Sequence, residues 1–277
     1  MLRNMKTMEG YAIAATDGAV GHVKDLYFDD AAWVVRYLVV ETGDWLAHRK
    51  VLISPISVGK PNWIDKTFPV SITQAQVKGS PSIDTDKPVS RQYEESYHRY
   101  YDYPYYWGGG LYADALTFES PDYGSAANDA HELAARNAAK ANAKKHRHDN
   151  PHLRSGNTVM HYSVHATDGN IGHVAGLLVD DVTWAIRYLV VSTSNWWGGH
   201  DVLIEPEWID DINWSESKVV VDLSRQAVKD SPPYDSEKVL TRDLESSTCK
   251  HYGRGSYWAR EAGHVSSRPS ASVSVSS

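Results

Sequence analysis

Short apolar stretches rich in β-branched residues alternate along this chain with polar turns, and the pattern occurs twice. In the first copy the pattern predicts strands over residues 11–15, 21–28, 33–41, 50–53 and 67–72. In the second copy the corresponding stretches are 162–166, 172–179, 184–192, 201–204 and 218–223. Five short strands joined by tight turns are typical of a small barrel or sandwich. The pattern therefore predicts a mainly β protein.

The two copies are related by a constant offset. Residues 33–40 (WVVRYLVV) return as residues 184–191 (WAIRYLVV), and Asp17-Gly18 returns as Asp168-Gly169. The offset is 168 − 17 = 151 residues, and it needs no gap. A solenoid unit is about 20–50 residues long. A period this long therefore indicates two copies of one domain.

Short helices are expected after the strands of each copy. Thr73 and Ser224 can cap helices over 74–78 and 225–229, because their hydroxyls can accept hydrogen bonds from free backbone N–H groups. Ser90 and Thr241 can cap a second pair over 91–100 and 242–251. An aromatic segment then closes each copy: Tyr105, Tyr106 and Trp107 in the first, Tyr257 and Trp258 in the second.

These patterns divide the chain into four parts. Residues 1–107 form the first domain and residues 153–258 the second. Between them, residues 108–152 are predicted to be a linker that is helical over 125–145, because that stretch is rich in alanine. Residues 259–277 are rich in serine and are expected to be a disordered tail.

Composition restricts the classes of function. The net charge of −7 over 277 residues gives no electrostatic argument for nucleic-acid binding. No apolar run approaches the roughly 18–20 residues of a membrane helix, so a cytoplasmic protein is expected. Cys249 is the only cysteine, which excludes an internal disulfide. Its counterpart in the first copy is His98, so Cys249 is read as a tolerated thiol, not a nucleophile.

Two pairs of adjacent acids are candidates for chemistry: Asp29 with Asp30, and Asp180 with Asp181. Paired carboxylates can serve acid–base catalysis or bind a hard cation. Adjacent residues in a turn usually point apart, however, and aspartate is common in turns because its side chain accepts backbone hydrogen bonds. The structural interpretation is preferred.

Arg36 and Arg187 each lie inside an apolar strand, beside the equivalent residues Trp33 and Trp184. A buried guanidinium requires an acidic partner, and the turn aspartates are the candidates. The alternative is recognition of an anion by the guanidinium. The pairing is preferred.

Other side chains give weaker signals. His22 and His173 recur at the offset, but no second ligand follows either at metal spacing, and no metal or other cofactor is expected. A tyrosine cluster precedes Trp107 and is interspersed with Arg91 and Arg99. These aromatic residues can stack bases or sugars, dock a partner, or simply cover one end of the barrel. The last interpretation is preferred.

The ordered motifs resemble the PRC-barrel family, named after the cytoplasmic domain of the photosynthetic reaction-centre H subunit. The resemblance is carried by Asp17-Gly18, by residues 28–30 (FDD), 33–40 (WVVRYLVV) and 51–55 (VLISP), and by their counterparts in the second copy. Residues 87–92 (KPVSRQ) and 105–107 (YYW) resemble an extension found in soluble bacterial members. The resemblance implies two small barrels in tandem and no defined activity.

A non-catalytic interaction or adaptor module is therefore the leading functional hypothesis, with a protein partner. The known members of the PRC-barrel family imply two alternatives: an accessory or assembly factor of a membrane electron-transfer complex, or a ribosome- or RNA-associated factor. The chain lacks both the membrane helix of the H subunit and the RNA-processing partner domain of the ribosome-maturation factor in this family. Peripheral association with a membrane stays compatible with the sequence. No enzyme is expected, because no nucleophile, base and orienting group are found together.

Overall fold

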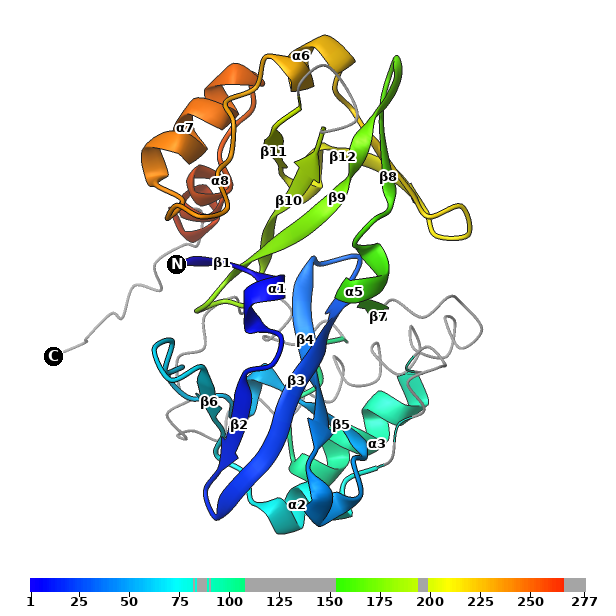
Figure 1. The fold of residues 1–277 in the computed structure, drawn as a ribbon, viewed down its shortest axis with the longest axis vertical. Coiled ribbons are helices and arrows are strands. Elements are labelled where there is room, and N and C mark those ends of the chain that lie inside the picture. The colour runs from blue at the N-terminus through cyan, green and yellow to red at the C-terminus, as the bar shows by residue number, and fades with distance from the viewer. Residues whose placement is uncertain (82, 84–88, 90, 108–152, 194–198, 267–277) are drawn as a thin grey trace, which may run out of the picture. The chain divides into compact units, whose positions relative to one another are not determined.

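The computed structural model describes residues 1–81, 83, 89, 91–107, 153–193 and 199–266. The predicted linker 108–152 and Ser90 lie outside these residues. The described chain is mainly β, as the sequence predicted, and its strands form two sheets (Figure 1). Cα packing divides it into two compact units. Unit 1 is Met1–Met160 with Gly176–Ile186, and unit 2 is His161–Ala175 with Arg187–Ser277.

The six-stranded sheet has the order β5-β4-β3-β2-β6, with β7 added beside β3. All its neighbours are antiparallel except β2 and β6. Alternating apolar side chains of these strands form the core of unit 1, around Tyr37, Leu52 and Tyr97. The bounds are β2 (Ala12–Ala15), β3 (Gly18–Asp29), β4 (Val34–Thr42), β5 (Lys50–Ile53), β6 (Thr67–Pro69) and β7 (Leu153–Ser155).

The seven-stranded sheet has the order β11-β10-β9-β8-β13-β12, with β1 added beside β9. Its parallel pair, β8 with β13, is the repeat equivalent of β2 with β6. The bounds are β1 (Leu2–Asn4), β8 (Ser163–Ala166), β9 (Gly169–Asp180), β10 (Ile186–Ser192), β11 (Asp201–Ile204), β12 (Ile209–Asn213) and β13 (Lys218–Val221). β5 and β11 have the predicted bounds. The other predicted strands differ at their ends, and β1, β7 and β12 were not predicted.

The two short strands β1 and β7 connect the repeats within unit 1. Leu2 pairs with Asp180 and Asn4 with Leu178, whereas Leu153 pairs with Asp29 and Ser155 with Tyr27. Positions 2 and 153, and 29 and 180, are equivalent at the offset of 151. Each copy therefore lends its first strand to the long strand of the other copy. For this reason unit 1 contains Gly176–Ile186 of the second repeat. Whether each repeat folds as a separate domain stays a prediction.

Glycine is required where the long strands β3 and β9 closely approach the backbone of a neighbouring strand. A Cβ on Gly21 would lie 2.0 Å from the carbonyl oxygen of Glu41, and one on Gly172 would lie 2.0 Å from that of Ser192. Gly172 also has a φ of +142°, which side-chain-bearing residues rarely adopt. The two glycines are repeat equivalents, so this close approach belongs to both copies.

The helices follow the strands as predicted, with the expected caps. Thr73 accepts from Gln76 N at 3.1 Å at the start of α2 (Gln74–Gly79), and Ser224 accepts from Ala227 N at 3.2 Å at the start of α6 (Arg225–Lys229). Asp17 and Asp168 add a contact that the sequence did not reveal, because each also accepts a backbone N–H of the same helix at 2.7 Å.

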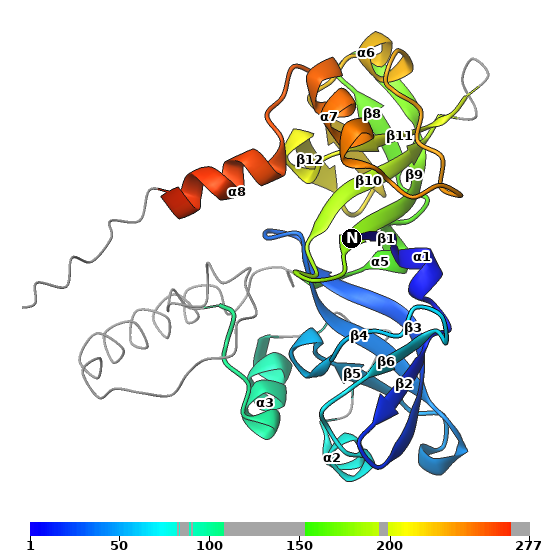
Figure 2. The same ribbon diagram turned by 90° about the vertical axis from the view of Figure 1, so that its left-hand side faces the viewer.

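The longer helices pack beside the sheets. Figure 1 shows α3 (Arg91–Tyr101) near β5, where Tyr97 and Leu52 share the core. In unit 2, α7 (Arg242–His251) lies next to α6, as Figure 2 shows, and His251 Nε2 is 2.7 Å from the carbonyl oxygen of Ala227. Short helical turns are α1 (Met5–Met8), α5 (Gly156–Val159), η1 (Asp44–Leu46), η2 (Pro55–Ser57) and η3 (Pro206–Trp208).

The expected tail begins with a helix. α8 spans Tyr257–Ser266, so the prediction of disorder from residue 259 is wrong over 259–266. Ion pairs hold the helix: Arg260 reaches Glu205 at 2.6 Å and Glu261 reaches Arg187 at 2.6 Å. These partners are distant in sequence, and local composition does not report them. Residues 267–277 lie outside the described residues.

Candidate interaction site

The acidic turns bind their own backbone. Asp29 Oδ1 accepts from Ala31 N at 3.0 Å and from Ala32 N at 3.2 Å. In the second repeat, Asp180 Oδ1 accepts from Val182 N at 2.9 Å and from Thr183 N at 3.0 Å. The first acid of each pair thus stabilises the turn that follows its strand.

The second acid of each pair faces a cation from the exchanged first strand of the other copy. Asp30 forms an ion pair with Arg154 Nε at 2.7 Å. Asp181 lies 2.5 Å from the Met1 ammonium and 3.6 Å from Arg3 Nε. The second acid of each turn, Asp30 or Asp181, therefore binds the exchanged strand to its new neighbour in both repeats.

Arg36 occupies a cation–π and ion-pair site. Its guanidinium lies 3.4 Å from Asp29 Oδ2, the expected pairing, and 3.9 Å from the centre of the Tyr106 ring. The Tyr106 hydroxyl donates to Glu94, which is 2% exposed, and Tyr37 donates to the same carboxylate at 3.3 Å. A buried carboxylate needs such donors, because desolvation opposes its charge. The closing segment therefore completes a polar network inside unit 1.

The second repeat contains an equivalent network that differs in the acid that pairs with the arginine. Arg187 lies 4.3 Å from the centre of the Tyr257 ring, and Tyr257 donates to Glu245 at 3.2 Å. Arg187 forms an ion pair with Glu261 of α8 at 2.6 Å, so it has the acidic partner that the sequence predicted, supplied by a residue that was not among the candidates. Glu94 and Glu245 are equivalent at the offset, a signal that the sequence carried and our prediction missed.

Burial perturbs the acids of the second network. Desolvation raises the pKa of Glu245 against the opposing effect of Arg242, and desolvation likewise raises the pKa of Glu205 although Arg260 lies 2.6 Å away. Desolvation, with the nearby Glu205, raises the pKa of the Cys249 thiol to about 12. The thiol is therefore protonated and buried, which suits a structural residue.

The two networks differ at equivalent interior positions. Ser54 of the first repeat corresponds to Glu205, and Tyr97 corresponds to Thr248. The Tyr97 hydroxyl donates to Leu52 O at 3.1 Å and accepts from Ser54 N at 3.0 Å. In the second repeat the carboxylate of Glu205 is buried and forms an ion pair with Arg260 at 2.6 Å. The shared backbone thus holds two different buried polar groups.

The remaining aromatic candidates have mixed environments. Trp33 stacks on Phe28 at 5.3 Å between ring centroids, and Trp184 is 5% exposed and 5.9 Å from Phe68. Trp258 lies under Arg242 at 4.2 Å. Tyr105, by contrast, is 45% exposed. Most of these rings pack within the fold, as does Tyr97, and Tyr105 is the candidate that stays accessible.

A groove of about 370 Å³ opens in unit 1 between two loops. One wall is η2 with the segment that follows it, including Ile56 and Trp63, and the other is the turn that carries Val182 and Trp184. Ile56 is 38% and Val182 69% exposed at its rim. The sequence did not predict this groove, because its walls come from different repeats.

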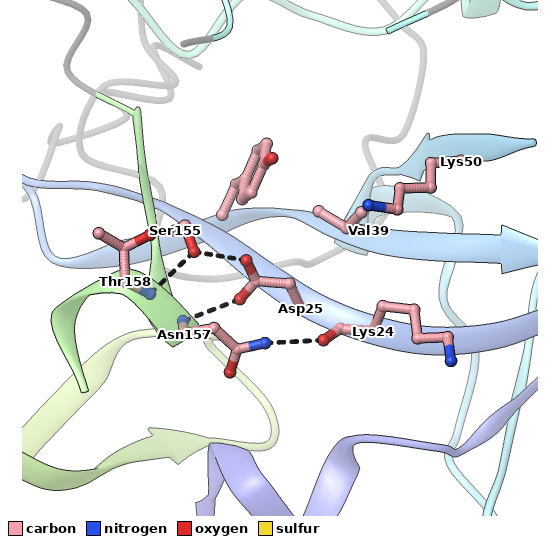
Figure 3. Close-up of a pocket in the computed structure, with 8 residues that line it drawn as sticks. Lys24, Asp25, Val39, Lys50, Ser155, Asn157 and Thr158 are labelled. Atoms are coloured by element: carbon pink, nitrogen blue, oxygen red, sulfur yellow. Dashed lines mark hydrogen bonds between the residues drawn. The ribbon is translucent and has the colours of Figure 1, made fainter. Parts of the chain in front are cut away.

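A second, smaller hollow of about 220 Å³ lies at the first turn of α5 in unit 1. Figure 3 shows Asp25 directed at Ser155 and Asn157, whose Oγ and backbone N–H donate to it at 2.5 and 3.0 Å. Desolvation raises the pKa of Asp25 against these hydrogen bonds. Asp25 anchors the exchanged strand β7 to β3, so the polar groups here have a structural role.

Neither a metal site nor a membrane-spanning helix is found among the described residues. Within them, no group of three or more His, Cys, Asp or Glu side chains is placed to hold a metal ion. His22 is exposed, and His173 stacks on His161 at 6.2 Å. None of the helices in the described ranges has the length and apolar character needed to cross a membrane.

A part of the first repeat is similar to a known protein family. No curated protein matches the sequence. The segment that matches a family model, residues 6–76, begins in α1 and ends in α2. It includes the turn at Asp29 and Asp30, Arg36, and the groove wall formed by η2 and the residues after it, all in the first repeat. Residues 6–76, which lie in the first repeat, match the model of the PRC-barrel domain.

Proposed function

We propose that this protein is a non-catalytic interaction module built from two PRC-type repeats. One observation carries the proposal: the charged side chains best suited to chemistry are paired within the fold in both repeats. Asp29 and Arg36 pair with each other, and Asp30 pairs with Arg154. What unit 1 presents to solvent is a groove with exposed apolar residues at its rim. Exposed apolar surface next to a groove is characteristic of binding sites.

The PRC-barrel match of residues 6–76 supports this assignment, because the domain suggests an interaction module. The second repeat is assigned to the same type through the constant offset and the equivalent Arg187–Tyr257–Glu245 network. A cytoplasmic location and the lack of intrinsic catalysis belong to the same proposal. Accessory roles in a membrane electron-transfer complex or on the ribosome are narrower alternatives that follow from the family resemblance.

The test is covalent capture in cells. A photo-crosslinking amino acid is placed at Tyr105, which is 45% exposed, and at the control position Val239, which is 69% exposed in unit 2. We expect a discrete protein adduct from position 105 and none from position 239. Fractionation before capture separates a soluble partner from a membrane complex and from ribosomes.

Two results would contradict the proposal. The first is that crosslinking at several exposed positions of both units yields no protein adduct. The second is that the purified chain turns over a substrate and that Asp29→Asn abolishes turnover. An adduct found only in the membrane or ribosomal fraction would instead select one of the narrower alternatives.

A further inference from the structure

We infer that the unit 1 groove binds a short segment of a partner protein in which an apolar side chain is next to an aspartate or glutamate. This inference rests on the proposed interaction function and names the partner's chemistry. The groove lies wholly within unit 1, since its lining residues fall in 55–63 and 181–184. Its lining is mainly apolar, with Pro55, Ile56, Val58, Pro61, Trp63 and Trp184.

The apolar side chains of the groove differ in their exposure to solvent. Ile56 and Val182 are 38% and 69% exposed, whereas Trp184 is 5% exposed. Trp63 is half-buried, and it makes a cation–π contact with Arg3, whose guanidinium lies 4.2 Å from the ring centre. A rigid aromatic wall beside exposed aliphatic residues favours insertion of an apolar side chain, which removes apolar area from water.

The charged residues of the lining favour a carboxylate next to that side chain. Lys60 and Asp181 are the two charged residues of the lining. Asp181 is engaged by the Met1 ammonium at 2.5 Å and by Arg3 at 3.6 Å, so its negative charge is compensated. Lys60 is exposed and adds a positive charge. The local charge is therefore positive, and electrostatic complementarity selects an acidic segment.

The second repeat supports the specialisation of this groove. At the offset of 151, Ile56 corresponds to Glu207 and Lys60 corresponds to Asp211. The repeats share interior motifs, yet these wall positions change from apolar and basic to acidic. The same comparison supplies test variants, because Ile56→Glu and Lys60→Asp each introduce the residue that this backbone carries in the other repeat.

The probe is a library of short random peptides displayed on phage and selected on the immobilised full chain. We expect enrichment of sequences with Leu, Ile or Phe next to Asp or Glu. Binding of an enriched peptide, measured by fluorescence anisotropy, should weaken about tenfold or more in Ile56→Glu. Lys60→Asp should weaken it by a similar factor at low salt and by less at high salt. Val239→Glu, at an exposed position of unit 2, is the control and should bind as the wild type does.

Several outcomes would overturn the inference: no enrichment, enriched peptides without carboxylates, or equal binding to Ile56→Glu with its fold intact by circular dichroism. Self-association of the wild type that Ile56→Glu abolishes would assign the groove to a second copy instead and would also overturn it. A cellular partner captured at Tyr105 whose binding ignores both groove variants would leave the interaction module standing and remove only the groove.

Discussion

Trp33 and Trp184, equivalent residues of the two repeats, bind each other's strand within unit 1. The carbonyl oxygen of Trp184 accepts from Val35 N at 2.9 Å, and that of Trp33 accepts from Ile186 N at 2.7 Å. Both tryptophans have left-handed backbones, with φ of 53° and 59°. This conformation is uncommon for a bulky residue and persists where the surroundings determine it. The reciprocal pair, together with β1 and β7, joins the repeats at the acidic turns.

Gly172→Ala should destabilise the protein by about 1–3 kcal/mol, because the new Cβ would meet a backbone carbonyl that cannot easily move. A Cβ at this position would lie 2.0 Å from Ser192 O, and φ is +142°. Gly43→Ala is the matched control, since its nearest neighbour is a side-chain atom 3.7 Å away. Urea unfolding measures both variants, and equal midpoints would contradict the argument that the backbones lie too close for a side chain at Gly172.

Arg36→Met should lower stability by about 1–3 kcal/mol, a value between those of exposed and buried ion pairs. The variant leaves Asp29 without its 3.4 Å partner and removes the cation from the Tyr106 ring. Arg187→Met should behave alike through Glu261 and Tyr257. Thermal unfolding is the measurement. Unchanged melting with loss of partner binding would favour anion recognition by these arginines.

Tyr106→Ala and Tyr105→Ala should separate packing from docking. Tyr106 carries the Arg36 stack and donates to buried Glu94, so its loss should lower the melting temperature. Tyr105 is 45% exposed, and its loss should change melting less. Capture of the cellular partner is measured on the same variants. If Tyr105→Ala melts normally and still captures the partner, Tyr105 has no docking role.

Glu205 and Glu245 should make stability depend on pH with a defined sign. Their pKa values are raised by desolvation above the ordinary glutamate value of 4.5. The folded state therefore holds these protons more tightly, and the stabilisation is full below pH 4.5 and lost as pH rises through the folded pKa values. Relative to the wild type, the double variant Glu205→Gln/Glu245→Gln should become more stable as pH rises through this range.

Urea unfolding at a series of pH values measures that difference. Glu207→Gln, an exposed neighbour that also contacts Arg260, controls for the loss of one carboxylate. A difference between the double variant and the wild type that stays constant with pH would show that the buried acids do not carry the effect.

Cys249 should react slowly with a thiol reagent in the native protein. The side chain is buried at 5% exposure, and its pKa is raised to about 12. Because the thiolate is the reactive form, labelling near pH 8 should be on the order of a hundredfold slower or more than in urea. Comparable rates with and without urea would mean that this part of unit 2 opens readily.

Local patterns predicted most of the fold. The β-branched run at Val34–Thr42, the cap at Thr241 and the turn at Asp29 each act through neighbours in sequence, and each has the expected structure. β1 and β7 have three residues each, and their partners lie in the other repeat, so no local periodicity could indicate them. α8 likewise depends on Glu205 and Arg187, which are far away in the chain.

The candidate site was predicted in part for the same reason. The Arg36–Asp29 pair spans one turn and followed from the pattern. The role of Glu94 could have been predicted from the sequence, because an acid that recurs as Glu245 in an aromatic helix needs an internal partner. The groove could not be predicted from the sequence, since Ile56 and Val182 are far apart in the chain and belong to different repeats. Tertiary contacts, not propensities, created that surface.

The exchange of Ser54 for Glu205 limits how the two repeats can recombine. Recombination can exchange segments between similar tandem sequences. In this protein the stability of the product depends on which residues are exchanged together. A chimera that carried Glu205 next to Tyr97, without Arg260, would bury an uncompensated carboxylate against an aromatic ring. Only blocks that move the strand, the following helix and α8 as a set keep the interior neutral. The two repeats are therefore not interchangeable segment by segment, although their strands follow the same order.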